Sequence, residues 1–198
     1  MQGIYVEPVR YEQTTTPTAL VVSVAEVKAC ARLDSADTLL DSLIESYIKA
    51  STMRIEKYSG LTIRETNFKG YYDSFPAVMK IRKRPNTLIT KIEYYSEDNV
   101  LTTLAGTEYM IQKEKYCSNI MASDDTDIGF PETKYKVDAV IVYVTCGWTA
   151  LNIPEDVKES IKQLAVSMLT NCDMSVAIPE ISKSMVSPYK NHFVVMEN

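Results

Sequence analysis

The sequence has too few of the residues from which common catalytic and metal sites are built. Histidine occurs once, as His192, and the four cysteines lie far apart without a CxxC pair. Zinc sites need closely spaced Cys and His ligands, and nucleophilic catalysis needs a base beside the nucleophile. No GxGxxG, P-loop or HExxH pattern occurs either. We therefore predict no catalytic residue, no metal site and no cofactor, and a protein that is not an enzyme.

Long apolar runs are also missing. No segment approaches the roughly 18 apolar residues of a membrane-spanning helix, and the N-terminus has no stretch of signal-peptide type. We expect synthesis in the cytoplasm and no membrane partner. Free cysteine behaves as a small buried apolar residue, so all four are predicted to be reduced thiols in apolar spaces: Cys30, Cys117, Cys146 and Cys172.

Positive charge is in the minority. The chain has 21 basic and 26 acidic residues, a net charge of −5. The summed field of such a protein repels nucleic acid unless its cations gather on one face. Bulk DNA binding is therefore disfavoured. Hydrophobic residues make up 45% of the 198 positions, enough for one sizeable core.

A helix is predicted near the start of the chain, over residues 24–33. Ser23 followed three positions later by Glu26 is a capping box, in which each side chain satisfies a backbone N–H of the first turn. Lys28 and Arg32 are one helical turn apart, and we expect them to form an exposed stripe.

Two longer helices and a short one follow the same kind of pattern. Asp34 to Asp37 supplies turn residues and an N-cap for the strongest helix, about 38–59, which ends at Gly60. A helix over 154–171 begins with a proline and two acids in its first turn. A short helix is expected over 179–185.

The segment between these helices is rich in Thr, Tyr, Val and Ile and broken by turn formers, which is typical of strands. Strands are predicted near 66–74, 78–84, 88–96, 100–104, 108–113, 119–122 and 137–146. Most should be antiparallel because the connections are too short for crossovers. The almost continuously apolar run 137–146 indicates the central strand. The prediction is an α+β fold, with helices from the N- and C-terminal parts packed together and an antiparallel β-lobe inserted between them.

The predicted organisation has three parts. They are an extended N-terminal arm (1–22), a main domain (23–171, helical over 23–60 and 153–171, with the β-lobe at 61–148) and a C-terminal tail (172–198). Pro17 and the threonines around it favour extended backbone in the arm. Apolar side chains suggest that the arm docks either on its own domain or on a neighbouring subunit. The tail either becomes ordered on assembly or packs on its own domain.

Three stretches occur in an order and spacing found in one known family. They are Ser23–Asp34 with the stretch Glu56–Leu61 at the end of the long helix, the basic turn Ile81–Pro85 with the strand Ile89–Tyr95, and Gly147–Trp148 leading into Ile153–Val157 and the helix after it. Together they resemble the head-to-tail connector (adaptor) proteins of long-tailed double-stranded-DNA phages and prophages.

The resemblance implies a structural virion protein at the head–tail junction, made in the host cytoplasm. Its subunits would form a ring, usually of twelve copies, that docks on the portal protein and joins it to a stopper or tail-completion protein. Double-stranded DNA would pass transiently, without sequence-specific binding. The alternative is that the chain is itself a stopper or tail-completion protein. A small ligand-binding domain or enzyme is a further alternative, which a deep apolar pocket with convergent polar groups would favour.

Interfaces are then the candidate functional sites. The expected interface residues are Lys80, Arg82, Lys83, Arg84, Tyr71, Tyr94, Tyr189 and Phe193. Three interpretations of the basic run stay open: a contact with another subunit or the portal, a solvated strand edge protected by charge, and a surface facing DNA. The tyrosines are candidates because tyrosine combines apolar area with a hydrogen-bonding tip.

An acidic stretch has part of the spacing of a calcium loop. Asp124, Asp125 and Asp127 place carboxylates close together, but loop position twelve, counted from Asp125, is Lys136 where an EF-hand needs glutamate. We therefore predict a polar surface loop.

Overall fold

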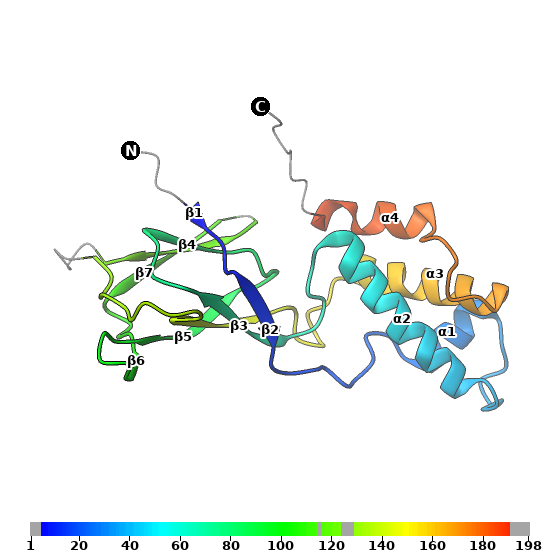
Figure 1. Cartoon of the computed structure of the whole chain (residues 1–198). Coiled ribbons are helices and arrows are strands. Elements are labelled where there is room, and N and C mark those ends of the chain that lie inside the picture. Colours follow the sequence, from blue (N-terminus) through cyan, green and yellow to red (C-terminus); the bar gives the residue numbers. More distant parts are fainter. Residues whose placement is uncertain (1–4, 115, 124–128, 191–198) are drawn as a thin grey trace. The chain divides into compact units, whose positions relative to one another are not determined.

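The computed structural model describes residues 5–114, 116–123 and 129–190. The chain forms two compact units, which Figure 1 shows as a group of strands and a group of helices. The β-unit comprises residues 1–17 and 65–147, and the helical unit comprises residues 18–64 and 148–190 with the rest of the C-terminus. The predicted α+β class is confirmed, with strands inserted between N- and C-terminal helices.

The helical unit is held by packing among its four α-helices, α1 (Val24–Ala31), α2 (Asp41–Ser59), α3 (Glu155–Asn171) and α4 (Glu180–Val186), followed by a short 3-10 helix, η1 (Ser187–Tyr189). Helix α3 packs against each of the other three α-helices. Fully buried side chains fill the space between α2 and α3, among them Ile44, Ile48, Ile55, Ile161, Leu164 and Met168. Each such side chain stabilises the fold by about 1.5–3 kcal/mol. The predicted packing of helices from the two ends of the chain is confirmed.

The ends of α1 and α2 follow the local sequence closely. The predicted capping box is present: the Ser23 backbone N–H donates to the Glu26 carboxylate at 2.6 Å, and the Glu26 N–H donates to Ser23 Oγ at 3.2 Å. Helix α2 ends at Gly60, whose φ of +70° lies in the left-handed region that glycine adopts without strain.

The start of α2 differs from its prediction. The helix begins only at Asp41, and its N-cap residue, Leu40, has no side-chain cap. Asp37 instead accepts a hydrogen bond from the Leu39 N–H inside the preceding loop. The expected exposure of Lys28 is also wrong, because Lys28 is 4% exposed. Its Nζ lies 2.5 Å from the Asp37 carbonyl oxygen and 2.5 Å from the Asp41 carboxylate, partners that make burial of the charge tolerable.

The β-unit consists of two sheets, with strand orders β1-β4-β8-β7 and β2-β3-β9-β5-β6. The strands are β1 (Tyr5–Val6), β2 (Arg10–Gln13), β3 (Thr66–Tyr72), β4 (Val78–Ile81), β5 (Leu88–Tyr95), β6 (Leu101–Thr103), β7 (Tyr109–Lys113), β8 (Ser118–Ala122) and β9 (Val140–Cys146). Pairing is antiparallel except between β1 and β4. The prediction that the last apolar run is a central strand is confirmed, because β9 lies in the middle of the five-stranded sheet.

A second apolar core lies within the β-unit. It includes Phe68, Tyr72, Met79, Ile92, Ile120 and the alternate β9 residues Val140, Val142, Val144 and Cys146. This alternation is the period of a strand with one face on the core.

Two of the four cysteines depart from the prediction. All four are free thiols, and Cys117 and Cys146 are buried as expected. Cys30 and Cys172 are exposed, because Cys30 lies on the outside of α1 and Cys172 ends α3 as its C-cap residue. Among the described residues, no helix combines the length and apolarity needed to cross a membrane.

Candidate interface: the arm and the basic run of the β-unit

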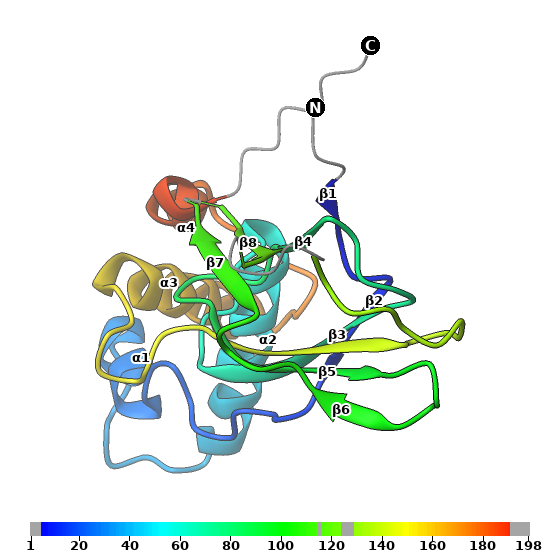
Figure 2. The same cartoon turned by 90° about the vertical axis from the view of Figure 1, so that its left-hand side faces the viewer.

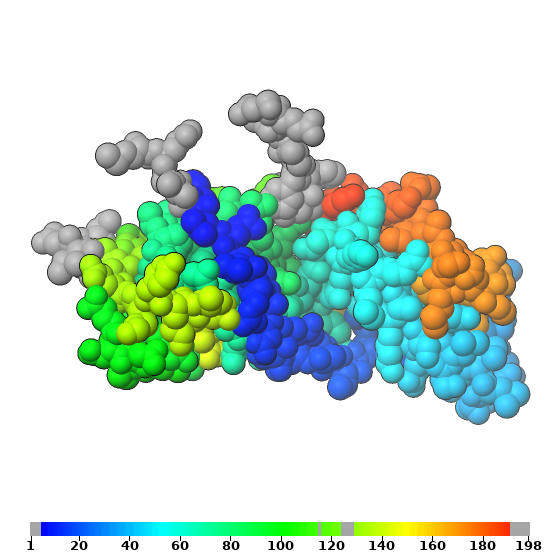
Figure 3. Space-filling model, in the orientation of Figure 1, coloured from blue at the N-terminus to red at the C-terminus, as the bar shows by residue number. Residues whose placement is uncertain are grey.

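The N-terminal segment 5–17, here called the arm, adds one strand to each sheet of the β-unit. Strand β1 pairs parallel with β4, and β2 pairs antiparallel with β3. Figure 2 shows the arm passing from the edge of one sheet to the edge of the other, and Figure 3 shows it on the outside of the unit. Both strands were missed from the sequence, because two and four residues separated by Pro8 are too short to show a period.

The basic run begins in β4 with Lys80, continues after the strand, and meets this arm. Its four cations are all half-buried, and each faces a partner within the β-unit. Lys80 lies over the ring of Tyr5, 5.2 Å from its centroid, and Arg82 forms an ion pair with Glu7. Lys83 lies 4.2 Å from the ring centroid of Phe68 and 5.1 Å from that of Tyr11. Arg84 lies 5.1 Å from the ring centroid of Tyr116. Three of these cations therefore contact the arm. Burial also lowers the pKa of Arg84 from its ordinary value.

Tyr71 on β3 is buried beneath the arm. It is 7% exposed, the Arg10 guanidinium lies 3.7 Å above its ring, and its hydroxyl donates a hydrogen bond to Glu12. Burial, together with the Glu12 carboxylate, raises the pKa of the Tyr71 hydroxyl. The arm of the same chain thus covers Tyr71, one of the expected interface residues.

A close steric fit holds the middle of the arm against β3. A Cβ atom on Gly70 would lie 3.1 Å from Pro8 Cγ and 3.3 Å from Tyr11 Cε1, so the missing side chain makes room for the arm. The Arg82 backbone N–H donates to the Tyr11 hydroxyl at 3.4 Å, and burial raises the pKa of that hydroxyl above its ordinary value.

Polar contacts fix the far end of the arm. Arg10 forms an ion pair with Asp138 at 2.6 Å. The Thr14 backbone N–H donates to the Asn67 carbonyl oxygen at 2.8 Å, and the Asn67 N–H donates to Thr15 Oγ1 at 2.9 Å. The arm is therefore in register with β3 as far as Thr15.

The remaining predicted interface residues do not join this surface. Tyr94 packs against the β-unit core, with its ring 5.4 Å from that of Phe75. Tyr189 lies in the helical unit, with its ring edge-on to Trp148 at 6.0 Å. Phe193 lies outside the described residues. The structure therefore brings together Lys80, Arg82, Lys83 and Tyr71, and the interface role of all eight residues stays a prediction.

A hollow in the β-unit is a candidate small-molecule site. Phe75 and Phe130 stack with ring centroids 4.7 Å apart beside it. Its volume is about 400 Å³, and it is lined by residues 74–77 and 130–133. Three of the eight lining residues have polar side chains, Ser74, Glu132 and Thr133, and Glu132 is the titratable one among them.

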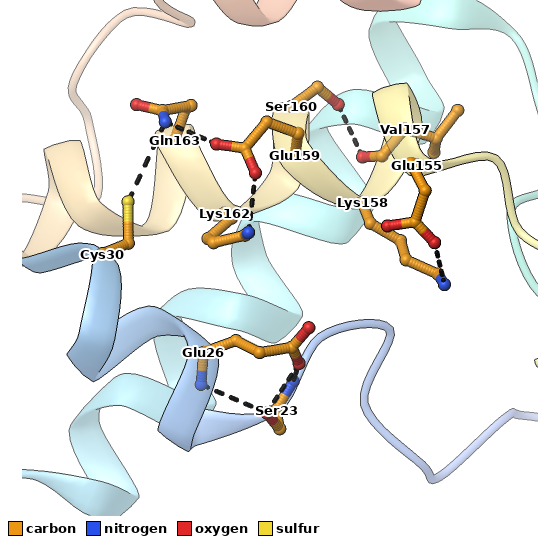
Figure 4. A network of polar contacts seen from close by, with 10 residues as sticks. All are labelled: Ser23, Glu26, Cys30, Glu155, Val157, Lys158, Glu159, Ser160, Lys162 and Gln163. Atoms are coloured by element: carbon orange, nitrogen blue, oxygen red, sulfur yellow. Dashed lines mark hydrogen bonds and ion pairs between the residues drawn. The ribbon is translucent and has the colours of Figure 1, made fainter. Parts of the chain in front are cut away.

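The outer surface of α1 and α3 carries a network of paired charges, drawn in Figure 4. Glu159 accepts hydrogen bonds from Lys162 Nζ and Gln163 Nε2, both at 2.6 Å. Hydrogen bonding to Lys162 and Gln163 lowers the pKa of the Glu159 carboxyl, and hydrogen bonding to Glu159 raises the pKa of Lys162. Gln163 Nε2 also lies 3.9 Å from Cys30 Sγ. These charges are satisfied within the helical unit.

The candidate metal ligands of the sequence lie mostly beyond the part of the chain that the structure describes. His192 and the acidic stretch Asp124, Asp125 and Asp127 lie outside the described residues. Within residues 5–114, 116–123 and 129–190, no three His, Cys, Asp or Glu side chains are grouped so that they could hold a metal ion.

Known proteins match this chain in structure but not in sequence. No protein-family model and no curated protein matches the sequence. A chain in the structure titled "Virion of native gene transfer agent (GTA) particle" matches with a TM-score of 0.76, 16% identity and coverage of 94% of this chain and 98% of that chain. A chain in "Neck of empty GTA particle computed with C6 symmetry" matches with a TM-score of 0.75, 15% identity and coverage of 96% and 99%.

A chain in "Neck of native GTA particle computed with C12 symmetry" has a TM-score of 0.66 and 16% identity, with coverage of 96% and 99%. At such identities the likeness is one of fold. It extends over nearly the full length of both partners in each comparison. The resemblance stated from the sequence is thereby confirmed at the level of fold: the chain has the fold of a protein found in the neck of a gene transfer agent particle.

Proposed function

We propose that the protein is a structural ring subunit at the head–tail junction of a tailed phage or related particle, and specifically the connector (adaptor) that docks on the portal. The observation that carries the proposal is the fold match, with a TM-score of 0.76 over 94% of this chain and 98% of a virion chain. A match that includes both units leaves no large part of the described chain for a separate activity. The protein would act through interfaces and not through catalysis.

The symmetry of the neck structures supports a ring of twelve copies. One neighbour comes from a neck computed with C6 symmetry and another from a neck computed with C12 symmetry. A ring of twelve identical subunits satisfies both, because a twelve-fold axis contains a six-fold axis. Head-to-tail contacts between different surfaces of identical subunits close into such rings.

The charge distribution supports passage of DNA without tight binding. The net charge of −5 opposes binding to phosphates, and three of the four cations in the basic run already contact the arm. Protein–DNA affinity comes largely from cations that neutralise phosphates. A DNA conduit built from this chain would therefore release its cargo easily.

The experiment that tests the proposal mixes the purified protein with the portal from the same genome and images the product by negative-stain electron microscopy. A ring on the outer face of the portal is the expected result. A portal from an unrelated phage is the matched control and should stay bare. Binding only to a preformed portal–connector complex would assign the chain to a stopper or tail-completion role. No binding to either would overturn the proposed function.

A further inference from the structure

The arm is a separable part of the β-unit. Without β1 and β2, the two sheets keep the orders β4-β8-β7 and β3-β9-β5-β6, and every strand in them comes from residues 65–147. In the sequence, α1 and α2 separate the arm from the other strands of these sheets. Its departure would leave β3 and β4 as open edges, and an open strand edge is a template for pairing with another chain.

The surface on β3 and β4 that binds the arm fits the side chains of the arm. The missing side chain at Gly70 admits Pro8 and Tyr11, as the distances of 3.1 and 3.3 Å from a Cβ there indicate. Arg82 and Asp138 provide opposite charges for Glu7 and Arg10. These features recognise the arm of any copy of the chain, whether its own or another, so the natural competitor for the site is a second copy.

The arm is held by many weak contacts. Tyr5 is 56% exposed and Val9 66% exposed, whereas Val6 and Tyr11 pack against the β-unit core. Partly exposed ion pairs such as Glu7 with Arg82 contribute little to stability, because solvent screens them. Segments with few buried apolar contacts open without unfolding the rest of a protein. Release of the arm alone, with the two sheets kept, is the step that an exchange between subunits requires.

A short segment joins the last contact of the arm to the helical unit. The last contact with β3 is made by Thr15, and Leu20 is the next residue packed in a core, that of the helical unit. Pro17 fixes its own φ and favours extended backbone at Thr16. Five extended steps reach about 17 Å.

We propose that in the assembled ring the arm of each subunit pairs with β3 and β4 of the adjacent subunit, which gives a ring of exchanged strands. This inference rests on the proposed ring function. The exchange replaces each contact by an identical one, so it costs little in contact energy. A neighbour fixed in the ring supplies the site at high effective concentration.

Disulfide trapping tests the exchange. Glu12 and Lys69 are paired across β2 and β3, so cysteines at these positions lie within reach of a disulfide. In a background of Cys30→Ser and Cys172→Ser, which removes the exposed thiols, Glu12→Cys and Lys69→Cys are made in separate preparations. The two are mixed, assembled on the portal and oxidised. The expected product is a covalent dimer on a non-reducing gel; none forms if each arm stays on its own subunit.

The double variant and its control locate the cross-link. Rings of Glu12→Cys with Lys69→Cys should give a ladder of covalent multimers. Lys91→Cys in place of Lys69→Cys is the matched control: Lys69 and Lys91 both pair with Tyr143, and β5 lies three strand spacings from β2, about 14 Å. That distance is too long for a disulfide, so the control should remain monomeric.

The unmodified protein provides a second measurement that does not depend on the folding of variants. Subunits labelled with ¹⁴N and ¹⁵N are mixed before assembly, and Glu12 is joined to Lys69 with a zero-length carbodiimide. With exchange, about half of the cross-linked peptide pairs combine the two isotopes, as random neighbours in a ring require. Rings with only same-isotope pairs would overturn the exchange and leave the proposed function intact. Absence of rings on the portal would contradict both the strand exchange and the proposed function.

Discussion

The two units satisfy their backbone hydrogen-bonding groups in different ways. In the helical unit the backbone hydrogen bonds close within each helix, and the helices meet through aliphatic side chains such as Ile48 and Leu164 that are fully buried. In the β-unit the sheets have edges, and two of these are covered by the arm. A helix offers another chain only its side chains, whereas a sheet edge also offers hydrogen bonds. The comparison shows why the arm site, and not a helix surface, suits strand exchange between copies.

Removing aliphatic volume from the helical core should have the largest effect. Ile48→Ala deletes part of a side chain that is 0% exposed, and such changes cost about 2–5 kcal/mol of unfolding free energy. Urea denaturation followed by circular dichroism measures the change. Met53→Ala on the same helix is the control, because Met53 is 69% exposed and its loss should stay within about 0.5 kcal/mol. Equal effects would mean that α2 does not pack as described.

Breaking the buried charge contact of the helical unit should come next. Lys28→Ala leaves the Asp37 carbonyl and Asp41 carboxylate without their shared cation, and we expect a loss of about 1–3 kcal/mol, since Asp41 is partly exposed to water. The control is Lys49→Ala, which removes the exposed pair with Glu45 at 3.7 Å and should cost about 0.3–0.5 kcal/mol. Denaturant titration of both variants at one pH compares them. A Lys28 effect as small as the control would place its ammonium group in solvent.

A substitution that blocks the docking of the arm should destabilise the β-unit and leave the helical unit unaffected. Gly70→Val places side-chain atoms where Pro8 and Tyr11 lie, and overpacking of this kind costs about 1–3 kcal/mol or displaces the arm. Hydrogen exchange should become faster in β3 and β4 and stay unchanged in α2 and α3. Gly106→Val is the matched control, because a Cβ at Gly106 meets nothing within 4 Å. Unchanged exchange in β3 and β4 would contradict the described packing of the arm.

Local patterns predicted most of the fold. The helices expected over 24–33 and 154–171 are observed as Val24–Ala31 and Glu155–Asn171, and the strand expected over 88–96 as Leu88–Tyr95. These elements are long enough to show a period and have their own caps or turns. The predicted start of α2 was wrong, because Asp37 was expected to cap the helix. Asp37 instead caps a turn inside the loop before the helix.

The candidate site could be predicted only in part, because its contacts are not local. The basic run and the tyrosines were visible as residue types, but the partners of Lys80 and Arg82 lie about 75 positions away in the arm, at Tyr5 and Glu7. A two-residue strand such as β1 shows no period by itself, and its pairing depends on an edge formed elsewhere. The close approach at Gly70 was a usable signal, since glycine inside a strand often marks contact with another backbone.

Acid should have the smallest effect, and it should act on the charge network of the helical unit. Hydrogen bonds from Lys162 and Gln163 lower the folded-state pKa of Glu159 below the usual 4.5 of glutamate. A carboxyl with a lowered folded-state pKa stabilises the protein above its unfolded-state pKa, and this contribution is lost as the pH falls through the folded-state value. The unfolding free energy from urea titrations should therefore be flat above about pH 6 and decline below about pH 4.5. Glu159→Gln should reduce this decline by about 0.3–0.5 kcal/mol. The uncharged control Met53→Ala should keep the full slope, and a slope unaffected by Glu159→Gln would show that the hydrogen bonds of Glu159 drawn in Figure 4 do not contribute to the pH dependence of stability.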